Sequence, residues 1–441
     1  MTLSALARFA ATADDFPQAV VEKSKACLLY ALAVGAASVA RSQPAVAARA
    51  FGADGGPATR FFDGARCDAA TAAFGNGTLL HARTQDDAHP AGHVGAVVVS
   101  AALAVAETVG AKESELIAAL VAGYEVALRI GRDHAADLSA RGFRTTPAYG
   151  VFGAAAAAGR LLGLSHDAMT HALALAANMG AGLREYSEAG SEDYAFQAGF
   201  GASNGIIAAR LAAAGATGAA SALDGKAGFF RAFGEARSDY GRRVADRLGE
   251  AFEMLAVTYK PYPICQFHRG LVRGMSILRE RAGPAELQAA TLRMHPFEAD
   301  FFGVRYAGPF TTFPQTFMSA PFCAALGWTR GAATLAGLTD FKARDVLAVV
   351  PHIAIVADAT RPRYSPRVEV RLSSGASLEW EEREGANAYL LTWVAARSIA
   401  GQLASETGTA AETTQRLVAA VESMKVAVVV DAMRRACGDR G

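Results

Sequence analysis

Apolar residues recur at helical spacing through the first half of the chain. Up to about Gly218, segments rich in Ala, Leu and Val alternate with short turns that contain Gly, Ser or Asp. One such segment has a stripe at i, i+3, i+4 and i+7, formed by Ile117, Leu120, Val121 and Tyr124. This spacing predicts a helix with one face toward a core, and the region as a whole is expected to be α-helical.

A break in the pattern near residue 163 predicts a helical hairpin. The sequence Leu162-Gly163-Leu164-Ser165 separates two alanine-rich helical segments. Gly163 is suited to end the first helix in a left-handed conformation, and Ser165 is suited to cap the start of the second.

The pattern changes after about Val257, where prolines become frequent and strand-like alternation appears. Residues 367–380 read as a β-hairpin with its turn at Gly375, with Val368 and Val370 on one face and charged side chains on the other. Helical spacing returns in residues 389–403 and 413–423.

These changes predict a mainly α protein of two domains. The expected order is a helical domain over residues 1–257, a smaller α+β domain over residues 258–388, and C-terminal helices over residues 389–441 that return to the first domain. At 441 residues the chain exceeds the usual size of one hydrophobic core, which fits this division.

Composition and charge exclude several classes of protein. The chain is 52% hydrophobic and 19% charged, unlike a disordered protein, and its 43 basic and 42 acidic residues form no basic stripe for nucleic acid. Its apolar runs are shorter than the ~20 residues of a membrane-spanning helix, and the start, Met1 to Asp15, lacks the apolar core of a secretory signal. Five scattered cysteines without a C-x-x-C pair argue against a disulfide framework or zinc site. We therefore expect a globular cytoplasmic protein that binds neither nucleic acid nor membrane.

A polar cluster precedes the apolar segment that begins at Val94. It contains His81, Thr84, Asp86, Asp87, His89 and His93, so three of the nine histidines fall within thirteen positions. Imidazoles at a helix entrance can bind a carboxylate or move a proton near neutral pH. Alternatively, Asp87 or His89 only caps or tethers a turn. Asp86, Asp87, His89 and His93 also suit a divalent metal, although no H-E-x-x-H or phosphate-binding motif accompanies them.

A second candidate segment is Tyr259-Lys260-Pro261-Tyr262-Pro263-Ile264-Cys265-Gln266-Phe267-His268-Arg269, at the expected domain boundary. Its prolines favour an extended backbone that displays Lys260, Cys265 and His268, and interdomain clefts are common binding sites. A lysine beside an apolar wall can lose its proton and act as a base. The alternative is a proline-stiffened linker whose lysine is solvated.

A third candidate segment, residues 141–150, precedes an apolar helical segment. Arg144 lies just before the expected helix start, where carboxylates are attracted, and its guanidinium can hold one with two hydrogen bonds. Tyr149 follows within the same segment. A surface arginine is the alternative.

Together these segments resemble the MmgE/PrpD family over nearly the whole chain. The marks that carry the resemblance are, in order, Asn76-Gly77 through His81, Asp86-Asp87 and His89 to His93; Val121-Ala122-Gly123-Tyr124-Glu125-Val126; Gly150-Val151-Phe152-Gly153-Ala154-Ala155; Leu223-Asp224-Gly225-Lys226-Ala227-Gly228-Phe229-Phe230; and Lys260-Pro261-Tyr262-Pro263. The family includes 2-methylcitrate dehydratase, cis-aconitate decarboxylase and iminodisuccinate epimerase.

The resemblance implies a large helical domain made from both chain ends, a smaller inserted α+β lid, a homodimer and a cofactor-free, metal-free cleft between the domains. It also implies that His93 and Lys260 line the catalytic pocket and that the chemistry removes a proton next to a carboxylate. Asp87, His89, Arg144, Tyr194 and His268 are the expected substrate-binding residues.

Several positions depart from the family pattern. Thr84 stands where relatives usually have Asp, Ala88 where Thr is expected and Val94 where Pro is usual. Arg144 and Cys265 occupy positions where histidines are common, and Tyr194 stands where Lys or Arg is common. Exchanging a titratable group for a fixed cation, and losing a cation at residue 194, changes how anions are bound. We therefore expect a substrate other than 2-methylcitrate or cis-aconitate.

These residues favour a dehydratase-like lyase that acts on a small di- or tricarboxylate, with Lys260 or His93 as the general base. The first alternative is an epimerase or isomerase of an amino- or imino-dicarboxylate, in which Cys265 or Tyr149 faces Lys260 or His93 across a substrate carbon. The second is a dimer that keeps the fold and binds a metabolite without catalysis.

Overall fold

The computed structural model describes residues 2–235 and 240–438. The chain divides into two compact units, each assembled from separate segments. Unit 1 comprises Met1–Leu183, Tyr194–Tyr259 and Leu391–Gly441, and unit 2 comprises Arg184–Asp193 and Lys260–Leu390. The expectation of a mainly α protein is confirmed, with one small mixed sheet in the later part of the chain.

Among its described residues, unit 1 contains helices and one short antiparallel pair of strands, β1 (Ala58–Thr59) and β2 (Arg66–Cys67). Its helices are α1 (Thr2–Thr12), α2 (Gln18–Ala37), α3 (Ser42–Ala50), α4 (Ala69–His81), α5 (Gly95–Val109), α6 (Glu113–Gly131), α7 (Ala135–Ala140), α8 (Thr145–Leu161), α9 (His166–Ala177), α11 (Tyr194–Ala213), α12 (Phe229–Phe233), α13 (Tyr240–Ala245), the 3-10 turn η1 (Glu253–Ala256), α20 (Trp393–Thr407), α21 (Ala411–Ser423) and α22 (Val426–Gly438).

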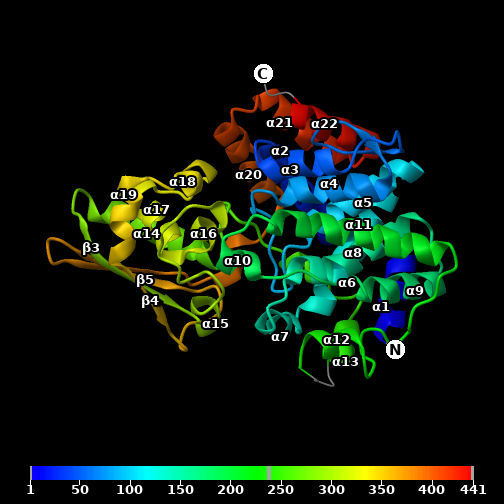
Figure 1. Ribbon diagram of the computed structural model, residues 1–441, viewed down its shortest axis with the longest axis horizontal. Coiled ribbons are helices and arrows are strands. Elements are labelled where there is room, and N and C mark those ends of the chain that lie inside the picture. Colours follow the sequence, from blue (N-terminus) through cyan, green and yellow to red (C-terminus); the bar gives the residue numbers. More distant parts are fainter. Residues whose placement is uncertain (1, 236–239, 439–441) are drawn as a thin grey trace. The chain divides into compact units, whose positions relative to one another are not determined.

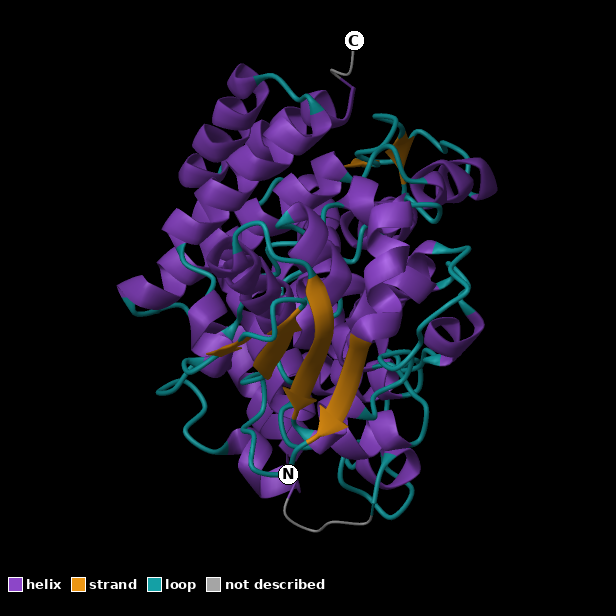
Figure 2. Cartoon of the chain, turned by 90° about the vertical axis from the view of Figure 1, so that its left-hand side faces the viewer, coloured by secondary structure: helices purple, strands orange, loops and turns teal. Residues whose placement is uncertain are grey.

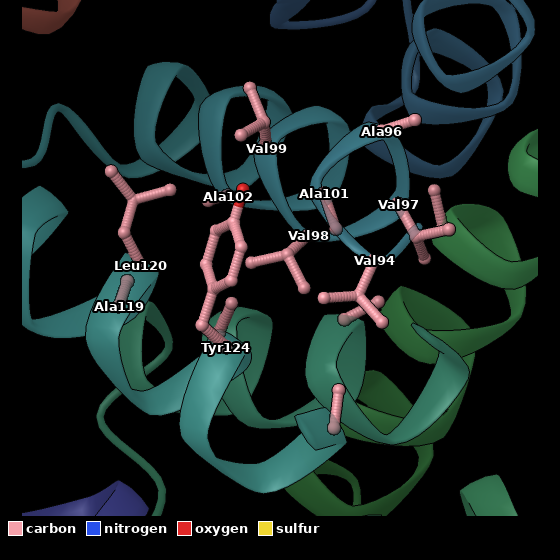
Figure 3. Close-up of a cluster of buried hydrophobic side chains, with 14 of the residues drawn as sticks. Val94, Ala96, Val97, Val98, Val99, Ala101, Ala102, Ala119, Leu120 and Tyr124 are labelled. Atoms are coloured by element: carbon pink, nitrogen blue, oxygen red, sulfur yellow. The ribbon is translucent and has the colours of Figure 1, made fainter. Parts of the chain in front are cut away.

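The core of unit 1 lies around α5, α6 and α8. The predicted helix around Tyr124 is confirmed, but α6 is buried from Ala118 to Gly131 rather than along one stripe, because α1, α2, α5 and α8 all pack on it. Figure 3 shows the side chains of Val98 and Tyr124 turned toward each other between α5 and α6. A Cβ on Gly153 of α8 would lie 2.6 Å from the carbonyl oxygen of Gly123 on α6, so both glycines permit a close helix crossing.

The predicted hairpin of helices is confirmed in α8 and α9. Gly163 follows the end of α8 with φ of +67°, a conformation that glycine adopts at little cost. The hydroxyl of Ser165 accepts a hydrogen bond from the backbone N–H of Ala168 and so caps α9.

The C-terminal helices pack against the N-terminal part of the chain. Helices α20, α21 and α22 all contact α2, and α22 also contacts α5. Figure 1 shows these helices (orange to red) beside the blue helices of the N-terminus. Within unit 1, helices that lie more than 350 residues apart in sequence therefore pack against each other.

Unit 2 contains the mixed sheet, with strand order β4-β3-β5-β6. Strand β3 (Leu287–Met294) pairs in parallel with β4 (Ile353–Ala357) and antiparallel with β5 (Arg367–Leu372), and β5 pairs antiparallel with β6 (Ser377–Glu381). Figure 2 shows these strands in orange. Its helices and 3-10 turns are α10 (Glu185–Ala189), η2 (Gln266–His268), α14 (Arg269–Ala282), α15 (Pro296–Ala299), α16 (Phe313–Met318), α17 (Ala320–Arg330), α18 (Leu335–Thr339), α19 (Arg344–Val349), η3 (Val350–His352) and η4 (Gly385–Tyr389).

The predicted β-hairpin over residues 367–380 is confirmed as β5 and β6, with Gly375 in its turn at φ of +85°. Val368 and Val370 are buried while Arg371 is exposed, as the alternation predicts. The buried face is covered by α14, where a Cβ on Gly274 would lie 2.4 Å from the ring of Trp380. Glycine at this position lets the indole pack directly on the helix.

Across the described residues, no single helix is both long and apolar enough to cross a membrane, although α2 and α3, bent by 91°, pass that test of length and composition as a pair. Most residues of α2 are buried within the protein. All five cysteines are free and buried.

Candidate functional site

The polar cluster lies in the loop that joins α4 to α5, and Asp87 organises its end. One oxygen of the Asp87 carboxylate, Oδ1, accepts a hydrogen bond of 3.1 Å from the backbone N–H of Gly95, the first residue of α5. The other, Oδ2, accepts one of 2.6 Å from the Tyr124 hydroxyl. A negative charge at a helix N-terminus is stabilised by the free N–H groups there. Asp87 therefore has the capping role that the sequence left open as an alternative.

His93 lies directly before α5 and is half-buried. Its Nδ1 is 2.7 Å from the backbone carbonyl oxygen of Asp87, and its backbone N–H donates to Oγ1 of Thr146 at 3.2 Å. Because a carbonyl oxygen only accepts, Nδ1 carries the proton of this bond. In the neutral ring Nε2 is then the basic nitrogen, which is the form a general base requires.

A second histidine of the cluster, His81, is fully buried between two charged groups. Its Nδ1 lies 2.8 Å from Oδ1 of Asp86, and its Nε2 lies 2.6 Å from Nη2 of Arg144. Since the guanidinium only donates, Nε2 accepts and Nδ1 donates to the carboxylate. This arrangement holds His81 as a neutral ring between an anion and a cation.

Arg144, the expected carboxylate binder, lies at the N-cap position of α8 and is buried. Besides its bond to His81, it donates through Nη1 to the carbonyl oxygen of Tyr194 at 2.8 Å and to Oε1 of Gln197 at 3.2 Å. The guanidinium therefore joins α8, α11 and the end of α4. These hydrogen bonds make Arg144 an organiser of the cluster, a role that the sequence did not suggest.

Tyr194 begins α11 and is fully buried beside the same histidine. Its hydroxyl donates to the carbonyl oxygen of Ala82 at 2.7 Å, and its ring meets the His81 ring edge-on at 5.8 Å. The rings of His81 and His93 lie 6.5 Å apart. Unit 1 thus brings together His93, Asp87, Arg144 and Tyr194 from three separate stretches of sequence.

His89 and Tyr149 lie in other parts of unit 1's polar network. His89 Nε2 is 3.6 Å from a carboxylate oxygen of Glu253, which also pairs with Arg132, and hydrogen bonding by His89 is the main cause that lowers the pKa of Glu253 to about 2. The Tyr149 hydroxyl lies 2.9 Å from Nδ1 of His134, in a cluster of aromatic rings. His89 tethers the loop to η1, which agrees with the alternative of a turn tether.

The three candidates in unit 2 lie in or next to the proline-rich segment, and all are buried: Lys260, Cys265 and His268. Burial is the main cause that raises the pKa of the Cys265 thiol to about 11, while Lys260 and Arg184 act in the opposite direction. Burial lowers the pKa of His268 to about 3. At neutral pH Cys265 is therefore a thiol and His268 a neutral ring, and neither is a ready base. Lys260 has no exposed surface.

Sequence reasoning missed the roles of Tyr124, Lys23 and Arg184. Tyr124 was read only as part of an apolar stripe, yet its hydroxyl bonds to Asp87. A buried tyrosine usually needs a hydrogen-bond partner for its hydroxyl, so the expected burial of Tyr124 was the signal in the sequence for such a bond. Lys23 is buried in an apolar helix, and Arg184 lies over the Phe301 ring at 4.5 Å in unit 2. No sequence pattern marked either residue.

The metal alternative at Asp86, Asp87, His89 and His93 has no supporting geometry. Asp86 pairs with His81, and His89 pairs with Glu253. The Asp87 carboxylate accepts hydrogen bonds from Gly95 and Tyr124. In the part of the chain that the structure describes, no group of three or more His, Cys, Asp or Glu side chains is placed to hold a metal ion.

Comparison with known proteins relates the chain to one enzyme family. Residues 4–239 match the model of the MmgE/PrpD N-terminal domain. A cis-aconitate decarboxylase of Aspergillus terreus is 28% identical over 283 residues, which cover 61% of this chain and 58% of that protein. Human cis-aconitate decarboxylase is 35% identical over 166 residues, covering 36% of this chain and 34% of its own length. A cis-aconitate decarboxylase-like protein of Aspergillus oryzae is 35% identical over 169 residues, covering 36% and 35%. The chain thus matches less than two thirds of each relative.

Proposed function

The chain belongs to the MmgE/PrpD family, and from this premise we propose that it is a lyase that removes a proton next to a carboxylate of a small di- or tricarboxylate. Its matched relatives carry the name cis-aconitate decarboxylase, so carboxylate substrates are the class that the comparison supports. The low identity and partial coverage leave the particular acid to experiment.

The observation that carries the proposal is the state of His93. Its proton is held on Nδ1 by the Asp87 carbonyl oxygen, so Nε2 is the basic nitrogen of the neutral ring. The ring is half-buried, whereas His81 in the same cluster is fully buried between Asp86 and Arg144. A half-exposed, tautomer-fixed imidazole is suited to general base catalysis near neutral pH.

The surroundings of His93 favour an anionic substrate. Its backbone N–H bonds to Thr146 in the first turn of α8, and Val94 precedes the first turn of α5. A helix N-terminus carries a partial positive charge that attracts carboxylates. At α5 the Asp87 carboxylate already accepts the Gly95 N–H, so this attraction supports the proposal at the start of α8. Arg144, at the N-cap of α8, adds a permanent cation nearby.

In the proposed elimination, Nε2 of His93 takes the proton from the carbon next to the carboxylate. The electron pair of that C–H bond forms the new carbon–carbon double bond, and the leaving group departs with the electron pair of its own bond. A departing hydroxide takes a proton to become water. The imidazolium formed at His93 supplies this proton and so returns to its neutral form.

Incubation of the purified protein with a panel of acids tests this function. The panel holds hydroxy-diacids, hydroxy-triacids and cis-aconitate, and the readouts are new alkene absorbance and released carbon dioxide. We expect one hydroxy acid to yield an alkene. If every acid remains unchanged at high enzyme concentration, the lyase proposal is wrong.

The same panel separates the two alternatives. An epimerase of an amino- or imino-dicarboxylate would exchange the α-hydrogen for deuterium from solvent without forming an alkene. A protein that only binds a metabolite would be protected against thermal unfolding by an acid that it neither converts nor labels.

We further propose that the chain forms a homodimer and works in the cytoplasm. Exposed apolar side chains on α11 support self-association, since Phe200, Ile207 and Leu211 lie on one face. Five free cysteines support a reducing compartment.

A further inference from the structure

Lys23 is a buried lysine in the middle of α2, a helix whose other residues are largely apolar. Removing an ammonium from water is costly unless hydrogen bonds replace the lost hydration. Lys23 Nζ donates to the carbonyl oxygen of Val257 at 2.7 Å and to that of Leu391 at 2.6 Å. The cost of burial is therefore offset by bonds to two backbone segments far away in sequence.

Those two segments are places where the chain leaves unit 1 and returns to it. The longer segment of unit 2 begins at Lys260, three residues after Val257, and ends at Leu390, directly before Leu391. The segments are also bonded to each other, because the backbone N–H of Leu391 donates to the carbonyl oxygen of Val257 at 3.1 Å. One ammonium thus joins the outgoing and returning chain within unit 1.

The outgoing segment is bonded to the loop of the candidate site. Thr258 and Ala88 exchange two backbone hydrogen bonds of 2.8 Å each, and the Thr258 hydroxyl donates to the Ala88 carbonyl oxygen at 2.9 Å. The residue before Ala88 is Asp87, whose carbonyl oxygen holds His93 Nδ1. Hydrogen bonds and the peptide links of neighbouring residues therefore connect Lys23 to the imidazole of His93.

The position of Lys23 requires two N–H donors on Nζ, which both the ammonium and the neutral amine have. Burial lowers the pKa of Lys23, while Cys27 and the Asp87 carboxylate act in the opposite direction. A side chain without a donor would remove one of the two hydrogen bonds to the Val257 carbonyl oxygen and would leave the Leu391 carbonyl oxygen without this bond. A buried carbonyl group that loses its partner is destabilising, so we expect the two segments to open more often.

We propose that Lys23 is a positioning residue whose ammonium holds the outgoing and returning segments together and, through Thr258 and Ala88, fixes the loop that carries Asp87 and His93. The effect on catalysis rests on the proposed function of His93, whereas the structural effect does not. Lys23 itself touches no reacting atom in this proposal.

Hydrogen–deuterium exchange of the full-length protein tests the structural effect without a substrate. In Lys23→Met we expect the amides of Ala88, Thr258 and Leu391 to exchange at least about tenfold faster, while α5 and α8 stay near wild type. Lys23→Arg should restore part of the protection, because a guanidinium can still donate to both carbonyl groups. Lys25→Met is the matched control, since Lys25 lies on the same helix but is only half-buried and donates to the Glu422 carbonyl oxygen.

The outcomes decide the proposal even if Lys23→Met is unstable. Unchanged exchange at the three amides overturns it, and so does an equal rise in α5 and α8, because that result describes general stabilisation. Should Lys23→Met not fold, Thr258→Val replaces it, because it removes the hydroxyl bond to Ala88 on the same path, and we expect the same local pattern. With an active substrate, kcat should fall more than KM rises; if kcat is unchanged while the amides exchange faster, Lys23 does not position the catalytic loop.

Discussion

The imidazole of His93 donates from Nδ1 to the backbone carbonyl oxygen of Asp87, 2.7 Å away, while the carboxylate of the same aspartate caps α5 and accepts the Tyr124 hydroxyl. One residue therefore fixes both the start of the helix and the tautomer of the proposed base. The helix and the base are coupled through a single short loop.

Replacing His93 with Gln should abolish most turnover. Glutamine can still donate to the Asp87 carbonyl oxygen but cannot accept a proton, so we expect kcat to fall by about 100-fold or more. The measurement is steady-state kinetics on the acid that the panel identifies. His171→Gln is the control, because His171 lies on α9 and contacts the Gly218 backbone. Comparable activity in both variants would remove His93 from the mechanism.

Tyr124→Phe should act mainly on stability. The variant keeps the ring packed between α5 and α6 but removes the bond of 2.6 Å to Asp87. We expect the free energy of unfolding in urea to fall by about 1–2 kcal/mol. Tyr306→Phe, which removes an exposed hydroxyl bond to Pro309, should change it by less than about 0.5 kcal/mol. Equal losses of unfolding free energy in the two variants would mean that the bond to Asp87 stabilises the protein no more than the exposed bond to Pro309 does.

Glu253 should make stability depend on acid pH. Its folded pKa is lowered from 4.5 to about 2, first by hydrogen bonding to His89 and then by Arg132, against the opposing effect of burial. Its stabilising contribution is therefore complete above pH 4.5 and is lost as the pH falls toward about 2. After allowance for solvent screening, we expect this contribution to be about 1 kcal/mol.

The test compares the free energy of unfolding of wild type and Glu253→Gln across that pH window. The two curves should differ near neutral pH and converge as the pH falls. Glu250→Gln, at an exposed side chain with an ion pair of 3.6 Å to Arg247, should follow the wild-type curve. A constant difference between wild type and Glu253→Gln at all pH values would refute the prediction.

Local patterns in the sequence were sufficient for much of the fold. The apolar period predicted the helix around Tyr124, Gly163 and Ser165 marked the turn between α8 and α9, and the alternation at Val368 and Val370 gave the hairpin. Each of these signals acts within about ten residues. The pairing of β3 with β4 joins segments some sixty residues apart, and no local pattern predicted it.

The candidate site was predictable only in part. His93 and Asp87 were found because polar residues cluster just before an apolar helix. The bonds that give them their roles come from distant elements: Tyr124 on α6, Thr146 on α8 and the Val257 segment held by Lys23. Spacing along one segment carries no information about such partners. For the same reason Arg144 looked like a carboxylate binder, whereas its donors meet His81, Tyr194 and Gln197.

Cys265→Ser should retain most of the activity of a one-base lyase. Because burial raises the pKa of this thiol to about 11, very little thiolate exists at neutral pH. We expect kcat/KM within about fivefold of wild type and an unchanged pH–rate profile below about pH 9. A loss of 100-fold in both Cys265→Ser and Cys265→Ala would instead favour the two-base epimerase. Circular dichroism of each variant checks that it is folded.

Ile207→Asp should dissociate the proposed homodimer. Phe200, Ile207 and Leu211 are 53%, 40% and 44% exposed, and their spacing of seven and four residues places them on one face of α11. The ring of Phe200 packs against Phe74, which also meets Phe51 after α3, so the apolar surface extends beyond one helix. A two-fold dimer can bury such a stripe against its own copy, and a carboxylate at its centre would be buried without a partner.

Sedimentation velocity at micromolar concentration measures the result. The wild type should sediment as a dimer and Ile207→Asp as a folded monomer. Val394→Asp is the matched control, because Val394 on α20 is 76% exposed and lies on a different helix. A wild type that sediments as a monomer refutes the dimer, and an Ile207→Asp variant that remains dimeric shows that the stripe on α11 is not its interface.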